Sequence, residues 1–366
     1  MKKLLVSLFL FAGIAFYGCD STEPDTNDNS DIPADPQNVT VPATTINNVQ
    51  PTAVFTPAAN NPGRIQVNLT GLINPVTQQP ITLFYDPNSP ASSNIFITED
   101  GAVKGLKVTK VGTGTVLKAD VVFTVDNSGS MYEEADSVAA SIIEFATFLQ
   151  ASGLDVQFAV VGYDGWVNGG INFTSAQNIS TYLNRATGTS RTYYFSGPDS
   201  AALTEKASSF APNVWGENGV VGVIFADSNY TWRAGAQRVF VNFTDEPTQP
   251  DNQLFWNTAL MCGLIGGKAT VHTVYSGPAD TSSYYGSSWS PSNERPWDMS
   301  LCTGGTIKII PQDATGLDLK NLPVAGALSN SYLVEYRAGS TGKSHTVVIT
   351  IKENNADGKR EYTVTY

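Results

Sequence analysis

The chain has 366 residues, which is enough for two ordinary domains with hydrophobic cores. Charged residues make up only 15% of it and the net charge is −12, so a clustered basic surface for nucleic acid is excluded. Two histidines and three cysteines are too few for a histidine-rich zinc centre or a small disulfide framework, and the composition favours an exported protein that contains β-structure.

The beginning of the chain predicts export and a lipid anchor. Two lysines precede an apolar run over residues 4–17, which is too short to span a bilayer and is typical of a secretion signal over residues 1–18. A glycine followed by Cys19 resembles a bacterial lipoprotein box, which implies lipidation of Cys19 and attachment to a bacterial outer membrane or cell surface by lipid alone. An ordinary signal peptide with an incidental cysteine is the alternative. In an oxidising compartment the remaining Cys262 and Cys302 predict a disulfide.

A disordered acidic tether is predicted over residues 19–62. Residues 20–63 contain no lysine or arginine, and six acidic residues crowd positions 20–35. Low hydrophobicity, like charges and repeated prolines are typical of a disordered spacer. Such a spacer would hold the folded part of the chain away from the membrane.

Both flanks of the folded part show short strand patterns, separated by turns rich in Pro, Asn and Gly. Neither flank has enough strands for a comfortable sandwich alone. We therefore predict one β-sandwich from residues 63–116 plus 330–366, with two small separate β modules as the alternative. The predicted strands cover residues 65–69, 81–85, 95–98, 106–111, 331–337, 346–352 and 361–365.

The middle of the chain, residues 117–329, alternates buried strands with amphipathic helices. Residues 119–125 form a continuous apolar run, and apolar side chains then recur at helical spacing from Val138 to Leu149. This alternation predicts an α/β unit, a parallel sheet wrapped by helices, inserted into the β-sandwich. The other predicted strands lie at residues 156–163, 238–244, 270–275 and 306–310, and the other helices at residues 220–228, 254–264 and 317–328.

Polar turns that follow two of these strands carry a motif. Asp126-Asn-Ser128-Gly-Ser130 follows the first strand, and Asp245 follows a later one. Together they resemble the metal-ion-dependent adhesion site of the von Willebrand factor type A domain family, over roughly residues 119–328. The resemblance implies a doubly wound, mostly parallel sheet of von Willebrand factor A or Rossmann-like type. Such sheets bind ligands at the carboxyl ends of their strands.

The chemistry of this motif suits a divalent cation. Carboxylates and hydroxyls are hard oxygen donors that fit Mg²⁺, Mn²⁺ or Ca²⁺ and retain zinc or copper poorly. Ser128 and Ser130 are expected to ligate the ion, and Asp126 and Asp245 to neutralise its charge directly or through water. A site with few protein anions leaves a position open for a carboxylate from a partner protein. The alternative is that Asp126 and Ser128 only cap the following helix.

Further residues resemble the integrin β-subunit form of the same family. Glu217 precedes a predicted helix where that subfamily has a metal-binding glutamate. Glu133 and Glu134 follow the serine motif at the spacing of the acidic pair in an adjacent metal site. Acids in the first turn are also ordinary complements of a helix dipole, which is the alternative for this pair. Glu246 stands where the family commonly has glycine.

Two long loops are predicted to select the partner. The first lies between residues 163 and 217, and the second covers residues 277–297. Rigid aromatic side chains among Ser and Gly suit protein interfaces, and they equally suit stacking on sugar rings. A self-packed loop with buried aromatics is the alternative. The predicted partner-binding residues are Tyr193, Tyr194, Tyr284, Tyr285, Trp289 and Trp297.

These patterns predict a binding protein. We expect no enzyme, because neither His272 nor His345 lies in a strand-end turn where it could serve a serine as a base. The leading prediction is a surface-anchored lipoprotein that binds a partner protein through a divalent metal. A carbohydrate-binding surface lipoprotein that uses the loop over residues 277–297 is the alternative.

Overall fold

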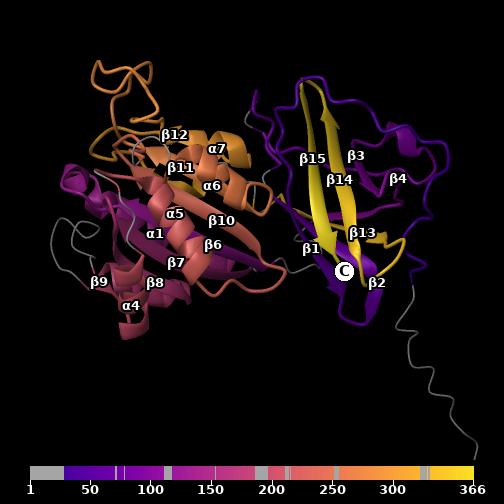
Figure 1. The fold of residues 1–366 in the computed structure, drawn as a ribbon, viewed down its shortest axis with the longest axis horizontal. Helices are drawn as coiled ribbons and strands as arrows, with labels where there is room; N and C mark the ends of the chain where they lie inside the picture. The colour runs from indigo at the N-terminus through magenta and orange to yellow at the C-terminus, as the bar shows by residue number, and fades with distance from the viewer. Residues whose placement is uncertain are drawn as a thin grey trace, which may run out of the picture.

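The structure is a computed structural model that describes residues 29–366 except for 71, 78, 111–117, 153, 186–196, 211–213, 215, 251–254, 322–327 and 329. The predicted signal peptide and Cys19 therefore lie outside the described residues. Two units lie side by side, and the indigo beginning and the yellow end of the chain build the same unit (Figure 1). No helix within the described ranges is long and apolar enough to cross a membrane.

The first unit consists of two four-stranded antiparallel sheets, and both sheets combine strands from the two flanks of the chain. The first sheet has the order β1-β2-β13-β5, and the second has the order β15-β14-β3-β4. The first comprises β1 (Thr52–Ala58), β2 (Asn61–Thr70), β13 (Tyr332–Arg337) and β5 (Lys107–Lys110). The second comprises β15 (Ala356–Thr365), β14 (Ser344–Glu353), β3 (Ile95–Glu99) and β4 (Ala102–Val103).

One core lies between these sheets. Alternate residues of a strand point to the same face, so Ile65 and Val67 of β2 meet Val347 and Ile349 of β14 in this core. The strand predicted over residues 81–85 is absent, because those residues run as irregular chain whose alternate apolar side chains are still buried. Apolar alternation alone therefore mimicked a strand there.

The disordered tether predicted over residues 19–62 is wrong in its described part. From residue 29 the chain lies along the sandwich as an extended segment, and β1 and the start of β2 fall inside the predicted tether. We call residues 29–50 the N-terminal strap. The side chain of Ile32 in the strap is completely buried. The composition of this segment is polar, which favours disorder. The side chains that hold it in place belong to later parts of the chain.

Acidic side chains hold the strap to basic ones on the sandwich. The Asp31 carboxylate accepts hydrogen bonds from Arg64 at 2.7 and 2.9 Å and from Lys107 Nζ at 2.6 Å. The Asp35 carboxylate accepts one from Lys104 Nζ at 2.6 Å, and Lys104 is only 3% exposed. The strap also passes so close to Gly105 that a Cβ there would lie 2.2 Å from a strap carbonyl oxygen. The strap is therefore an integral layer of this unit.

The double variant Asp31→Asn with Asp35→Asn is expected to loosen the strap. Partly exposed ion pairs contribute about 1 kcal/mol or less each, so amide exchange over residues 29–50 should accelerate about tenfold while the melting temperature changes little. Hydrogen exchange followed by mass spectrometry measures this. Asp313→Asn, an exposed acid of the other unit, is the control. Unchanged exchange in the double variant would contradict the role of these pairs.

The second unit is built on a seven-stranded mixed sheet of order β12-β11-β10-β6-β7-β8-β9. Pairing is parallel from β12 to β7 and between β8 and β9, and antiparallel between β7 and β8. The strands are β6 (Lys118–Asp126), β7 (Asp155–Tyr163), β8 (Val167–Thr174), β9 (Gly197–Pro198), β10 (Gln237–Thr244), β11 (Ala269–Tyr275) and β12 (Ile307–Ile309).

Helices cover both faces of this sheet. Along β6, Val121 and Phe123 face one core, which α1 and α2 complete, whereas Val122 faces a second core that contains α5 and α6. The predicted loop between residues 163 and 217 is largely regular structure, because β8, α2, β9 and α4 lie within it. The α-helices are α1 (Ala135–Ala151), α2 (Ala176–Leu183), α4 (Ala201–Ser209), α5 (Gly219–Asn229), α6 (Thr258–Ile265) and α7 (Asp298–Thr303).

The fold class predicted for the chain, an α/β doubly wound and mostly parallel sheet of von Willebrand factor A or Rossmann-like type, is wrong. Strand makes up 37% of the structure and helix 23%. Two of the three sheets are wholly antiparallel and the third is mixed. The prediction gave too much weight to the alternation of strand and helix in the middle of the chain. Of the helix predicted over residues 317–328, the structure describes the short 3-10 turn η3 (Leu319–Asn321), and residues 322–327 lie outside the description.

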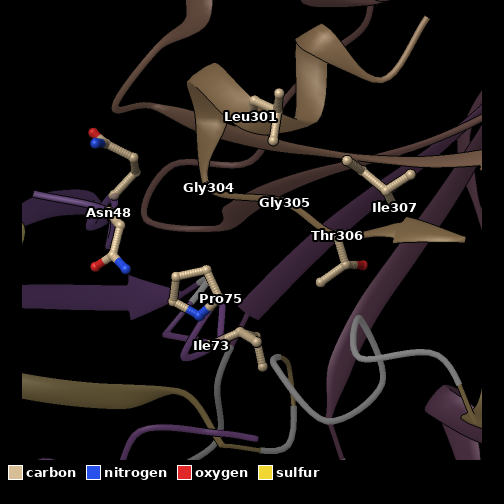
Figure 2. Close-up of a pocket in the computed structure, with 9 residues that line it drawn as sticks. Asn48, Ile73, Pro75, Leu301, Gly304, Gly305, Thr306 and Ile307 are labelled. Carbon is tan, nitrogen blue, oxygen red and sulfur yellow. The ribbon is translucent and has the colours of Figure 1, made fainter. Parts of the chain in front are cut away.

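The two units touch through backbone and side-chain contacts. The Ala53 amide of β1 donates to the Gly267 carbonyl at 3.2 Å, and Asn68 Nδ2 of β2 donates to the Gly235 carbonyl at 2.9 Å. A cavity of about 390 Å³ lies at this junction, between Ile73 on the sandwich and Leu301 on α7 (Figure 2). Its lining contains no ionisable side chain and none of the predicted site residues.

Candidate functional site

The predicted metal motif and Asp245 lie at one edge of the mixed sheet. Strands β6 and β10 are parallel neighbours, and Val125 is paired with Phe243. The next residues, Asp126 and Thr244, therefore leave the sheet together. The turn after β6 places Ser128 and Ser130 beside the turn after β10, which carries Asp245.

Hydrogen bonds join these two turns directly. Thr244 Oγ1 donates to Asp126 Oδ2 at 2.8 Å, and Ser130 Oγ donates to Asp245 Oδ1 at 3.0 Å. The hydroxyl oxygens of Ser128 and Ser130 lie 3.0 Å apart. Sequence analysis did not single out Thr244 as a contact of Asp126, although their matched positions at the ends of adjacent strands could have suggested it.

Asp126 and Ser128 form a local turn and do not cap α1. The Ser128 amide donates to Asp126 Oδ1 at 3.0 Å. The N-cap of α1 is Glu134, and no side-chain capping bond forms there. The geometry thus gives no support to the capping alternative and leaves the oxygens of the two turns facing one another.

Glu217 reaches the same cluster from the start of α5. Asn218 caps this helix by accepting a bond from the Val220 amide at 3.0 Å, and its Nδ2 donates to the carbonyls of Gln249 and Trp256 at 3.0 Å each. The helix begins close to the sheet, because a Cβ on Gly219 would lie 3.0 Å from the Tyr163 hydroxyl. Ser128 lies near enough to the Glu217 carboxyl to lower its pKa, against the larger effect of burial.

The cluster concentrates negative charge. Burial, and next the charge of Glu217, raises the pKa of Asp126 well above its usual range. Burial, and next the charge of Glu246, raises the pKa of Glu217 to about 7. Burial also raises the pKa of Asp245 and of Glu246. No basic side chain is among the main causes of these four shifts, so no neighbouring cation of the described chain offsets them.

The donors at this edge suit a hard cation. They are carboxylate and hydroxyl oxygens, which Mg²⁺, Mn²⁺ and Ca²⁺ prefer. Asn127, between the two motif residues, is 5% exposed, and neither polar atom of its side chain has a hydrogen-bond partner among the described residues. Over the same residues no group of three His, Cys, Asp or Glu side chains is arranged to hold a metal. An ion here would therefore depend on the serine hydroxyls as well as on the acids.

Glu133 and Glu134, predicted as an adjacent metal site, lie in different surroundings. Glu133 is exposed, whereas Glu134 is completely buried and accepts a hydrogen bond from Ser276 Oγ, next to the end of β11. Its second carboxylate oxygen has no hydrogen-bond partner among the described residues. Burial raises the pKa of Glu134 to about 7. The two side chains are therefore not presented together to one ion.

The predicted partner-binding aromatics divide into four groups. Tyr193 and Tyr194 lie outside the described residues. Trp297 is 8% exposed and packs edge-on against Tyr275 of β11, with ring centroids 5.1 Å apart. Tyr285, in contrast, is 63% exposed. The remaining two, Tyr284 and Trp289, are half-buried, so the loop over residues 277–297 is self-packed at its base and exposed at its tip.

The cysteines and histidines lie away from the strand-end turns. Cys262 of α6 and Cys302 of α7 are joined by a disulfide with an S–S distance of 2.00 Å. His272 is buried in β11, its Nδ1 lies 2.8 Å from Thr306 Oγ1, and burial lowers its pKa to about 3. His345 is buried in β14 of the sandwich, with Nδ1 2.9 Å from Asp100 Oδ2. Each histidine therefore contacts a residue outside its own strand, Thr306 for His272 and Asp100 for His345.

Sequence analysis also missed two contacts around the cluster. Tyr284 of the aromatic loop donates a hydrogen bond from its hydroxyl to Glu246 Oε1. The Glu246 amide in turn donates to Thr244 Oγ1 at 3.1 Å. Glu246 drew notice only as a departure from the family pattern, and no sequence signal linked it to a tyrosine 38 residues later.

Comparison with known proteins assigns no family to the chain. No protein-family model matches the chain, and no curated protein matches it. Among solved structures the chain is similar to the pilus adhesin SpaC from Lactobacillus rhamnosus GG in its open conformation, with a TM-score of 0.38 and 12% identity. That similarity covers 87% of this chain and 48% of the adhesin, so the chain spans about half the length of that protein. A likeness at this level carries no assignment of role or residue.

Proposed function

We propose that this protein is a surface-displayed binding protein that holds a divalent cation at the candidate site and captures a partner protein through a carboxylate of that partner. Asp126, Ser128, Ser130, Glu217 and Asp245 would hold the ion, which would supply positive charge to a partner's acidic side chain. The observation that carries the proposal is the hydrogen-bonded meeting of acidic side chains and two serine hydroxyls at one edge of the sheet. Among the described residues, no basic side chain is a main cause of the pKa shifts of these acids.

The electrostatics support a cation better than they support a purely structural cluster. Buried carboxylates are ordinarily paired with a base, protonated or bound to a metal. Asp120 is an example of the first kind, since it is completely buried and accepts bonds from the Arg233 side chain and amide at 2.7 and 2.8 Å. The candidate site has hydroxyls in place of such a base. A hard cation held by the serine hydroxyls would offset the charge of the acids beside them.

The surroundings of the site favour a macromolecular partner. The exposed tip of the aromatic loop presents Tyr285, and the same loop reaches the site through Tyr284. Exposed tyrosines on a braced loop are common in protein interfaces. A sugar-stacking platform needs an open ring face, whereas Trp289 and Trp297 pack edge-on against each other at 77°. We therefore place the protein partner ahead of the glycan.

Cation binding is tested on the double variant Ser128→Ala with Ser130→Ala. Both changes remove a hydroxyl oxygen without adding bulk, so we expect affinity for Mn²⁺ to fall about 10- to 100-fold, as for lost metal-site contacts. Isothermal titration with Mn²⁺ alone measures the fall. Ser208→Ala, an exposed serine on α4, is the matched control. Wild-type affinity in the double variant would overturn the proposed site.

Partner chemistry is tested with an array of short peptides, each made with one acidic residue or its amide counterpart. We expect wild-type protein in Mn²⁺ to retain acid-form peptides and to lose them in EDTA, and we expect the double serine variant to retain neither form. Equal capture of acid and amide forms would contradict carboxylate recognition. A glycan array with and without chelator tests the alternative partner in the same format.

A further inference from the structure

The tip of the aromatic loop is a tight hairpin that fixes Tyr284 in register. The Tyr284 amide donates to the Ser287 carbonyl at 2.9 Å, and the Ser287 amide donates back at 2.8 Å. Both residues between them have positive φ, 43° at Tyr285 and 82° at Gly286. A two-residue hairpin turn of this kind matches the twist of the strands that it joins. The non-glycine residue at positive φ is held there by the surrounding loop.

The hairpin is braced against the body of the second unit. Glu294, at its far end, forms two backbone hydrogen bonds with Thr248, at 3.0 and 2.9 Å. The carboxylate of Glu294 also accepts a bond from the Thr258 amide at the start of α6, at 2.8 Å. Trp289 packs on Trp297 with ring centroids 5.3 Å apart. The loop after β11 is therefore tied to the loop after β10, which carries Glu246.

Glu246 stands next to the proposed cation ligands but is turned to the hairpin. Its neighbour Asp245 accepts a bond from Ser130, and its own amide donates to Thr244 Oγ1, which donates to Asp126. After burial, the charge of Glu246 is the next cause of the raised pKa of Glu217. Its Oε1, however, accepts the hydroxyl of Tyr284. Glu246 is thus a further acidic side chain of this cluster, and its orientation depends on another loop.

We propose that Tyr284 is a positioning residue that holds the Glu246 carboxylate toward the hairpin, so that a cation at the site keeps one position free for a partner's carboxylate. This inference rests on the proposed function. Without the tyrosine hydroxyl, Glu246 turns to the cation and takes the place that the partner needs. The variant would bind the ion more tightly and the partner less well, which are opposite effects of one change.

Tyr284→Phe tests the inference without any partner. The phenyl ring retains the packing against Tyr285, 4.9 Å between centroids, and Trp289, 6.2 Å, and loses only the hydroxyl. The probe is Tb³⁺, whose luminescence lifetimes in H₂O and D₂O count its bound waters. We expect Tyr284→Phe to carry about one water fewer and to bind Tb³⁺ about tenfold more tightly, because affinity rises with the number of carboxylate ligands.

Two further variants make the test specific. Tyr284→Phe combined with Glu246→Gln should return the water count to that of wild type, because the added ligand is then neutral and weak. Tyr285→Phe makes the same chemical change on the adjacent exposed ring. It should leave the number of bound waters and the affinity for Tb³⁺ at wild-type values. Acidic peptides retained by wild-type protein should be lost from Tyr284→Phe and regained by the double variant.

The outcomes separate this inference from the proposed function. Wild-type protein that fails to bind Tb³⁺ overturns the proposed cation site and the inference with it. Tb³⁺ binding with the same water count and affinity in Tyr284→Phe overturns the inference alone. The inference also fails if Tyr284→Phe loses a water and the double variant does not regain it, because Glu246 is then not the added ligand.

Discussion

In EDTA the free energy of unfolding of the wild-type protein is expected to fall as the pH rises from 5 to 8. In the Glu134→Gln variant this fall is expected to be much smaller. Burial raises the pKa of Glu134 to about 7, supported by the negative charges of Asp245 and Glu133 and opposed by the bond from Ser276. The folded protein therefore keeps this proton up to about pH 7, whereas the unfolded chain releases it near the ordinary value of 4.5.

The sign of the effect follows from proton binding. Between these two pKa values the folded state binds more protons than the unfolded state, so the free energy of unfolding falls as the pH rises. For Glu134 alone the fall is at most about 3 kcal/mol, and a neutral glutamine has no such cost. Glu217, whose pKa is also raised to about 7, acts in the same direction and leaves a residual slope in the variant.

Urea unfolding at pH 5, 6, 7 and 8 in EDTA measures this dependence. Glu133→Gln is the matched control, because it removes the same charge at the adjacent exposed position. The control should keep the slope of wild type. A Glu134→Gln protein that loses as much stability as wild type over the same range would show that this carboxyl is already ionised in the folded state.

Replacement of both bonded cysteines, Cys262→Ser with Cys302→Ser, is expected to lower the free energy of unfolding by about 4 kcal/mol. The bond closes a loop with a sequence separation of 40, and chain-entropy estimates for a loop of that length give about this value. The bond also ties α6 to α7, which directly follows the aromatic loop.

Chemical denaturation of the oxidised protein and the double serine variant gives the difference. Added reductant should destabilise wild type by a similar amount and should leave the double variant unchanged, which controls for effects of the reductant itself. A loss below about 1 kcal/mol would mean that the unfolded chain gains little freedom when this bond is absent.

The local elements of the second unit could be predicted because hydrophobic periodicity is a property of neighbouring residues. The run over residues 119–125 lies within β6, and the helical spacing from Val138 to Leu149 lies within α1. The class of the whole chain could not be judged from that segment alone. Strands on both flanks pair across more than two hundred residues of sequence, as β13 does with β2, and local patterns carry no record of such pairing.

The N-terminal strap shows why ordered irregular chain is missed. The acids at positions 31 and 35 are uncompensated within their own neighbourhood, which favours disorder. Their bases, Arg64, Lys104 and Lys107, appear only once the sandwich has formed. Order in this segment therefore depends on tertiary structure and not on its composition.

The candidate site was predictable in part, because the ends of strands can be recognised from local sequence. Asp126, Ser128, Ser130 and Asp245 follow strands directly, so parallel pairing is enough to bring them to one edge. The burial of Glu134 and the link from Glu246 to Tyr284 depend on how two loops and α1 pack. These contacts determine the charge and shape of the site, and the spacing of residues gives no sign of them.

The docked strap limits how far the binding face can stand from an attachment point. Between Cys19 and Asn29 there are 29 − 19 = 10 residue steps, which can extend over at most about 35 Å. The predicted spacer of 62 − 19 = 43 steps would have extended over about 150 Å. If lipid holds the chain at Cys19, the sandwich therefore stays close to the bilayer, and any further reach of the binding face comes from the two folded units themselves.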